Sequence, residues 1–147
     1  MDNARNSGKG GKSEYATFFL KNALCGIALS AIQEISKPSR LTVVHQSPDY
    51  VMGVINLRGK IVTIIDTGKL LGLAPIKRSD DTRNIIVNLD EEFVGLMVDR
   101  IGNVITVEPA QADMPPANIG DVPGRYFNAV YKTNDEVVGL LSLNSFF

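Results

Sequence analysis

Two aspartates, Asp66 and Asp99, each follow a run of apolar residues that has the composition of a β-strand. Paired carboxylates at strand ends are the groups that glycoside hydrolysis or proton transfer requires. A carboxylate in this position also caps the turn or helical segment that follows, because its oxygens accept backbone N–H groups. We expect capping at both positions and keep a small hydrolase that uses Asp66 and Asp99 as a distant alternative.

The other groups with reactive potential are few. The chain has one cysteine, Cys25, and one histidine, His45, so a disulfide framework and a Cys/His zinc site are excluded by number. Cys25 lies in an apolar run, where a free cysteine is usually a small buried apolar group. His45 lies in a polar loop, and we expect its side chain to be solvated. The sequence therefore indicates no catalytic residue, cofactor or metal, and the protein is not expected to be an enzyme.

A phosphate-binding loop is also excluded. Five residues, instead of four, separate Gly53 from Gly59, and Ile61 stands where a Ser or Thr would bind magnesium. Arg58 is the more informative residue of this segment, because it lies at the predicted tip of a hairpin with two apolar arms. A displayed arginine binds a carboxylate or anchors an interface. Glu34, beside Ile32 and Ile35, is its acidic counterpart, and an ordinary surface role for both charges stays open.

The charge balance argues against polyanion partners. Fifteen Lys and Arg face sixteen Asp and Glu, which gives a formal net charge of −1 and leaves no basic surface for nucleic acid. The sequence also lacks the uninterrupted apolar run of about 18 residues that a membrane span needs. We therefore expect a cytoplasmic protein without nucleic-acid partners and without direct membrane insertion.

The length of 147 residues and the hydrophobic fraction of 44% predict one cooperative unit with a substantial core. Residues 1–13 combine Arg5, Lys9 and Lys12 with three glycines and carry no apolar run. We interpret residues 1–13 as a disordered tail and residues 14–147 as a single domain made of two interleaved subdomains.

Short apolar runs rich in Val and Ile, separated by turn residues, predict an all-β fold. Strands are expected at residues 15–21, 24–29, 41–44, 50–56, 60–66, 84–89, 93–99, 103–107, 127–133 and 136–141. A left-handed Asn22 is expected in the first hairpin, and a bulged loop of three to five residues with positive φ at Gly59 in the second. Residues 67–71 are expected to form a helical turn, and 142–147 a short helix or tail.

One segment carries a helical signal. Ser30 and Gln33 have the spacing of a capping box, which predicts a helical turn that ends by Lys37 because Pro38 follows. A second pattern is a glycine between apolar residues, at Gly53, Gly95 and Gly139. Glycine within a strand indicates a sharp bend or a close approach of another chain segment, so the recurrence predicts small, tightly curved barrels.

The segment Gly53–Gly59 (GVINLRG), followed by Ile64-Ile65-Asp66, resembles the corresponding motif of the CheW-type adaptor domains of bacterial chemotaxis. Further blocks agree in order and spacing, from Phe19 to Ile35 upstream and from Val94 to Val104 downstream. The resemblance runs from about residue 15 to the C-terminus. It implies two five-stranded SH3-like β-barrel subdomains packed on a shared hydrophobic core.

The function that the resemblance implies is that of a non-enzymatic adaptor. Such adaptors couple the cytoplasmic tips of chemoreceptors (methyl-accepting chemotaxis proteins) to the regulatory domain of the histidine kinase CheA. The resemblance therefore implies a cytoplasmic protein that is recruited to receptor arrays at the inner face of the membrane. A CheW-like scaffold of a non-flagellar sensory cluster remains the alternative within the same family.

The resemblance also implies the residues that form the interfaces. Receptor binding is expected from Ile32, Glu34, Asn56, Leu57, Arg58 and Gly59. A kinase or receptor interface is expected from Val94, Val98, Asp99 and Val104. Because a receptor tip is a helical hairpin, the expected contact is an apolar helix face in a groove, with charge pairs setting register and specificity.

Overall fold

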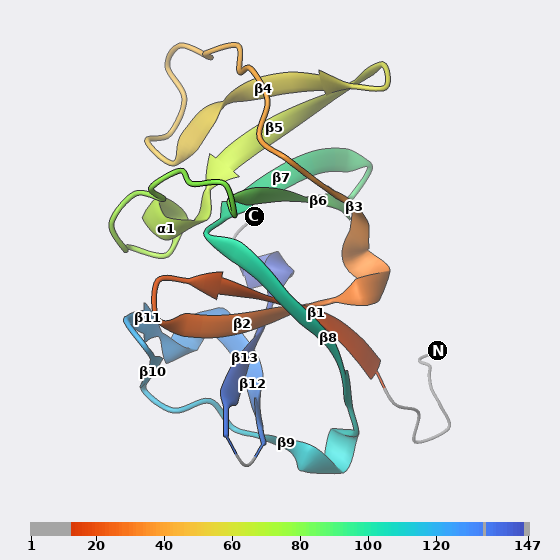
Figure 1. The fold of residues 1–147 in the computed structure, drawn as a ribbon, viewed down its shortest axis with the longest axis vertical. Helices are drawn as coiled ribbons and strands as arrows, with labels where there is room; N and C mark the ends of the chain where they lie inside the picture. The colour runs from red at the N-terminus through yellow and green to blue at the C-terminus, as the bar shows by residue number, and fades with distance from the viewer. Residues whose placement is uncertain (1–12, 134, 146–147) are drawn as a thin grey trace. The chain divides into compact units, whose positions relative to one another are not determined.

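The computed structural model describes residues 13–133 and 135–145, and these residues form thirteen β-strands with only short helical turns (Figure 1). The strands are β1 Ser13–Leu20, β2 Ala23–Ala28, β3 Ile32–Ser36, β4 Val51–Leu57, β5 Lys60–Asp66, β6 Arg83–Leu89, β7 Glu92–Val98, β8 Arg100–Val107, β9 Ala112–Asp113, β10 Asn118–Ile119, β11 Val122–Pro123, β12 Phe127–Lys132 and β13 Val137–Leu141. The helical turns are η1 Leu29–Ala31, α1 Thr67–Leu70, η2 Pro109–Gln111, η3 Gly124–Tyr126 and η4 Leu143–Ser145. The predicted all-β class is confirmed.

The chain forms two compact units. One consists of residues 31–101, and the other is built from the segments on either side, up to Ser30 and from Gly102 onward. We call them the inner unit and the flanking unit. The predicted tail, residues 1–13, lies outside the described residues apart from Ser13, which begins β1.

The inner unit is a five-stranded sheet in the order β3-β6-β7-β5-β4. Two antiparallel hairpins, β4–β5 and β6–β7, are joined by a parallel pairing of β5 with β7. The centre of this sheet is fully buried at Ile64, Ile85 and Ile86. These β-branched residues suit the pleated, two-sided packing of central strands.

The flanking unit repeats this plan. Its main sheet has the order β8-β1-β2-β13-β12-β9, in which the hairpins β1–β2 and β12–β13 are joined by a parallel pairing of β2 with β13. Strands β10 and β11 form a separate two-stranded sheet. The inner unit has the five strands expected for each subdomain. The flanking sheet has six, because its two joined hairpins have one further strand at each edge, β8 on one side and β9 on the other.

Glycines lie at the same place in both sheets. Gly95 and Gly139 each occupy the strand that pairs antiparallel on one side and parallel on the other. A Cβ atom on Gly95 would lie 2.5 Å from Ile64 Cδ1, and one on Gly139 would lie 2.4 Å from Phe127 Cε1. The close approach that was predicted from the repeated glycine pattern is therefore confirmed at both positions.

The predicted helical turn that begins at Ser30 is wrong. Helical structure here is limited to η1, which contains Ser30 and ends at Ala31. Residues Ile32–Ser36 form β3, which pairs antiparallel with β6 and carries an irregularity between Ile32 and Glu34. The capping-box spacing is a local signal worth about 1 kcal/mol. It yields to pairing with β6, which satisfies the backbone groups of a whole strand.

Three hairpins close with two-residue turns, as their registers show: Leu20 pairs with Ala23, Leu57 with Lys60, and Leu89 with Glu92. In the first, Lys21 (φ 56°) is left-handed, which corrects the expectation for Asn22. In the second, both Arg58 (φ 52°) and Gly59 (φ 83°) are left-handed. The expected bulged loop is thus a tight turn, although the positive φ at Gly59 is confirmed.

The expected strand at residues 41–44 is reduced to a single bridge. Thr42 pairs antiparallel with Val54 of β4, and its neighbours lie outside regular structure. Other boundaries agree more closely with expectation: β5 spans Lys60–Asp66 as predicted, and α1 follows it and ends before Gly72 (φ 79°).

Candidate functional site

Arg58 lies at the tip of the β4–β5 hairpin of the inner unit, and its side chain is 77% exposed. Residues on both sides of Arg58 fix the turn. Asn56 Oδ1 accepts a hydrogen bond from the Gly59 backbone N–H at 2.9 Å. Gly59 supplies a left-handed conformation at which a Cβ would meet nothing within 4 Å. Asn56 and Gly59 therefore act by shaping the turn that displays Arg58.

The structure brings Arg58 and Glu34 together. Arg58 Nη1 donates a hydrogen bond to Glu34 Oε1, which makes an ion pair between the turn after β4 and the strand β3. Because β3 and β4 are the opposite edges of the five-stranded sheet, the sheet must curl for this pair to form. An exposed ion pair contributes only about 0.2–1 kcal/mol, so packing of the core, and not this contact, drives the curl.

Beneath the ion pair is a hollow of about 100 Å³ at the end of the curled sheet. The strand register places Leu57, Val62 and Phe93 on the same face of the sheet as Glu34. The full lining is Gln33, Glu34, Leu57, Arg58, Lys60, Val62, Ile86 and Phe93. The hollow thus has an apolar floor and a charged rim, a combination that fits an aliphatic side chain flanked by polar groups.

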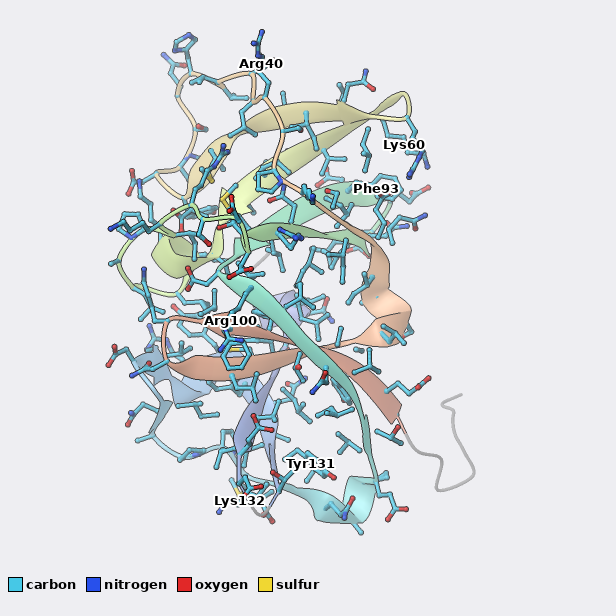
Figure 2. The ribbon with its side chains drawn as sticks, in the orientation of Figure 1. Arg40, Lys60, Phe93, Arg100, Tyr131 and Lys132 are labelled. Atoms are coloured by element: carbon cyan, nitrogen blue, oxygen red, sulfur yellow. The ribbon has the colours of Figure 1, made fainter. Side chains whose placement is uncertain are left out.

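Lys60 covers one side of this hollow. Its Nζ lies 4.3 Å from the centre of the Phe93 ring, which is within the range of a cation–π interaction (Figure 2). On the other side of Lys60 and Phe93 is a second hollow, which is lined by Lys60, Ile61, Thr63, Glu91, Glu92, Phe93 and Val94. Lys60 and Phe93 therefore form the border between two concave surfaces of the inner unit.

Ile32 points away from Glu34. The register pairs Ile32 with Val87 and Glu34 with Ile86, which places the two residues on opposite faces of the sheet. Ile32 shares its face with Ile35 and Ile61, which are 41% and 62% exposed. Ile35 and Ile61 were not predicted as surface residues. The signal for Ile61 was its alternation with the buried Val62 in β5, since successive residues of a strand face opposite sides.

The residues of the second predicted interface group differ in how exposed their side chains are. Val94 and Val98 are 7% and 0% exposed, so their side chains pack inside the protein; Val94 contributes only to the floor of the second hollow. Asp99 is half-buried in the bend after β7. Val104 lies on β8 in the flanking unit and is 54% exposed, which makes it the one member of this group with a largely accessible side chain.

Asp66 has a structural role. Its side chain is buried and accepts hydrogen bonds from the backbone N–H groups of Lys69 at 3.0 Å and Ile76 at 3.0 Å. The first of these bonds caps α1. The capping interpretation is confirmed for Asp66, and a carboxylate enclosed in this way is not accessible to a substrate of the alternative hydrolase.

The remaining reactive groups are also placed by the structure. Cys25 is buried in β2, and burial raises the pKa of its thiol to about 12, so the thiol stays protonated at neutral pH. His45 is exposed, as expected. Across residues 13–133 and 135–145, no three His, Cys, Asp or Glu side chains are placed to hold a metal ion. No helix in these ranges is long and apolar enough to cross a membrane.

Comparison with known proteins gives consistent matches. Residues 14–147 match the CheW-like domain family. The chemotaxis protein CheW of Helicobacter pylori is 30% identical over 128 residues, which cover 87% of this chain and 77% of that protein. The chemotaxis protein CheW of Treponema pallidum is 28% identical over 138 residues, which cover 91% of this chain and 81% of that protein.

A solved structure has the same fold. The scaffolding protein TtCheW from Thermoanaerobacter tengcongensis superposes with a TM-score of 0.80 at 26% sequence identity. The match covers 97% of this chain and 90% of that chain. The two sheets therefore match the two-subdomain SH3-like architecture expected from the sequence resemblance.

Proposed function

Since the chain belongs to the CheW-like domain family, we propose that it is a non-enzymatic adaptor that couples chemoreceptor tips to the histidine kinase CheA. In this role the protein is cytoplasmic and is recruited to receptor arrays at the inner face of the membrane. The observation that supports the proposal best is the displayed Arg58, with its ion pair to Glu34 above an apolar hollow.

The geometry of Arg58 suits recognition of a partner. Glu34 is the one hydrogen-bond partner of the guanidinium among the described residues, and it engages a single nitrogen, Nη1. A guanidinium has five N–H donors, so Arg58 can bind a carboxylate of a partner while it keeps its contact with Glu34. Glu34 also holds the long Arg58 side chain in one orientation, which lowers the entropic cost of binding.

The apolar component of binding comes from the other face. Ile32 and Ile35 lie on β3 and are at least partly exposed on one face of the sheet, where they provide contact area for the apolar side of a helix. Area of this kind supplies affinity, and the charged pair at the sheet end sets register and selects the partner. Receptor binding by Ile32, Glu34, Leu57 and Arg58, in a turn shaped by Asn56 and Gly59, is the arrangement that we propose.

The kinase or receptor interface proposed for the second group divides into two kinds of residue. Val104 and Asp99 retain accessible surface and are proposed as contacts. Val94 and Val98 are proposed to act indirectly, because substitution of a buried valine in β7 alters the strand that carries Phe93 and borders both hollows.

The test is co-purification of the full chain with purified CheA regulatory domains and receptor signalling tips, together with receptor-dependent kinase activity. We expect Arg58→Ala to fold normally, because an exposed ion pair contributes about 1 kcal/mol at most. We expect the same variant to weaken ternary assembly and kinase activation. Normal receptor-dependent activation by a well-folded Arg58→Ala protein would refute the proposal.

Glu34→Lys sharpens the assignment. The substitution places two cations where the ion pair was, and we expect it to impair receptor binding more than kinase binding. Lys132→Glu, an exposed charge reversal in the flanking unit, serves as a matched control with no expected effect. Equal loss of both partners in Glu34→Lys would show that the receptor role assigned to Glu34 is wrong.

A further inference from the structure

Residues 41–44 form an unfinished strand at the edge of the inner sheet. Thr42 and Val54 exchange two backbone hydrogen bonds, of 2.9 and 2.8 Å, on the outer side of β4. In an antiparallel pair the residues on either side of such a position direct their N–H and C=O groups the other way. The backbones of Leu41 and Val43 accordingly have no hydrogen-bond partner among the described residues.

The flanking unit shows what a complete strand looks like at the corresponding edge. There β8, with eight residues, lies beside β1, just as residues 41–44 lie beside β4. The sequence of the unfinished strand, Leu-Thr-Val-Val, has the β-branched composition that favours extended structure. Its strand propensity is therefore in place, and its outer backbone edge is open to a further strand.

The side chains around this edge favour a particular partner. Val43 and Val44 are 67% and 40% exposed. Lys37 and Arg40 are exposed at the start of the same connection, and Figure 2 shows Arg40 directed away from the ribbon. The acidic residue of this connection, Asp49, is already paired with Lys69 at 3.3 Å. The edge is thus apolar and basic.

We propose that residues 41–44 are a docking edge for an extended acidic segment of a partner protein, which adds to the inner sheet by β-strand addition. The partner exchanges backbone hydrogen bonds with Leu41 and Val43, and its carboxylates lie near Lys37 and Arg40. A second copy of this chain is a poor occupant, because its residues 37–48 carry no carboxylate to place beside Lys37 and Arg40. The site uses neither Arg58 nor Glu34 and is therefore additional to the proposed coupling role.

The probe is a fluorescein-labelled peptide of alternating glutamate and valine, with an alternating lysine and valine peptide as its control. Fluorescence anisotropy at low salt reports binding to the full chain, and amide hydrogen exchange reports its location. We expect the acidic peptide to bind, to slow exchange at Leu41 and Val43, and to dissociate as salt is raised. Binding of both peptides alike, protection confined to other residues, or no binding would overturn the proposal.

Two variants separate the charge from the backbone contribution. Arg40→Glu should weaken acidic-peptide binding at least about fivefold, whereas the charge reversal Lys132→Glu in the flanking unit should leave it unchanged. Val43→Pro removes the outward N–H and should abolish binding. If Val43→Pro does not fold, Arg40→Glu still decides, because unchanged binding in that variant contradicts the proposal. Receptor-dependent kinase activation by Arg40→Glu distinguishes this site from the coupling site, and we expect it to be normal.

Discussion

The inner and flanking units have the same strand plan but differ in what their turns and edges present. In each, two antiparallel hairpins are joined by a parallel pairing, β5 with β7 in one and β2 with β13 in the other. The corresponding hairpin turns are Arg58-Gly59 in the inner unit and Lys21-Asn22 in the flanking unit. The inner turn has a glycine and an arginine that reaches the opposite edge strand. The comparison shows one scaffold used twice, with the candidate binding residues placed at strand ends, where they can vary without altering the plan.

The two parallel pairings also differ in their centres. Gly95 lies opposite Ile64, whereas Gly139 lies opposite Cys25. The space around Gly95 is limited by the flexible ends of isoleucine side chains, and the space around Gly139 is limited by the rigid Phe127 ring. Both pairings thus require a glycine, but the side chains that approach Gly95 are flexible and the ring that approaches Gly139 is rigid.

Alanine substitutions at these two glycines are expected to give the largest difference in stability between the two parallel pairings. Gly139→Ala places a Cβ within 2.4–2.6 Å of the Phe127 ring atoms, which cannot move aside without displacing their neighbours. We expect a loss of about 3 kcal/mol in the free energy of unfolding. Gly95→Ala meets isoleucine Cδ1 atoms that can change rotamer, and we expect a loss of about 1 kcal/mol. Urea titration of both variants measures the difference, and equal losses would show that the two pairings are equally rigid.

An intermediate effect is expected at alkaline pH. Burial raises the pKa of Cys25 from 9.0 to about 12, so the folded state holds the thiol proton more tightly than the unfolded state. The corresponding stability is complete below pH 9 and is lost as pH rises from about 9 towards 12, with about 1 kcal/mol lost between pH 9 and 10. Unfolding titrations at these pH values should show this fall, and Cys25→Ala should reduce it. A fall of the same size in Cys25→Ala would assign the pH dependence to another group.

The smallest effect concerns the turns within the inner unit. Asp90 (φ 47°) and Glu91 (φ 71°) form a left-handed two-residue turn without glycine, whereas the Arg58-Gly59 turn has one. Glu91→Gly should stabilise the protein by about 0.5 kcal/mol, because relief of left-handed strain exceeds the entropy that glycine loses. Gly59→Glu is the matched reverse change and should destabilise. Thermal melts of both variants measure these shifts; destabilisation by Glu91→Gly would mean that Glu91 makes a contact that outweighs the strain.

Sequence patterns predicted the hairpins more reliably than the edges. The bounds of β5, from Lys60 to Asp66, follow directly from its apolar run and from the turn residues that precede it. The edge strand β3 was missed because its evidence lies in β6, about fifty residues further along the chain, while the Ser30–Gln33 spacing is local. The strand expected at 41–44 has the right composition, but most of its backbone finds no partner within the inner unit.

The sequence pointed to the individual residues of the candidate site, but it did not predict which of them lie in contact. Arg58 at a hairpin tip and Glu34 on a neighbouring segment could both be identified from their apolar surroundings. Their contact depends on the curl that brings β3 to β4, which is a property of the whole five-stranded sheet. For the same reason the sequence could not show that Val98 is fully buried or that Lys60 lies over Phe93.

The insertion of one unit within the other has a consequence for the order of folding. In the inner unit the parallel strands pair Ile64 with Gly95, so all of its contacts become available once residue 101 has been synthesised. In the flanking unit Cys25 of β2 pairs with Gly139 of β13. The β1–β2 hairpin can therefore join the rest of its sheet only after nearly the whole chain has been synthesised. Contacts between distant residues form slowly because a long loop must first be closed. We therefore expect the inner unit to fold first during synthesis and the flanking unit to limit the overall rate.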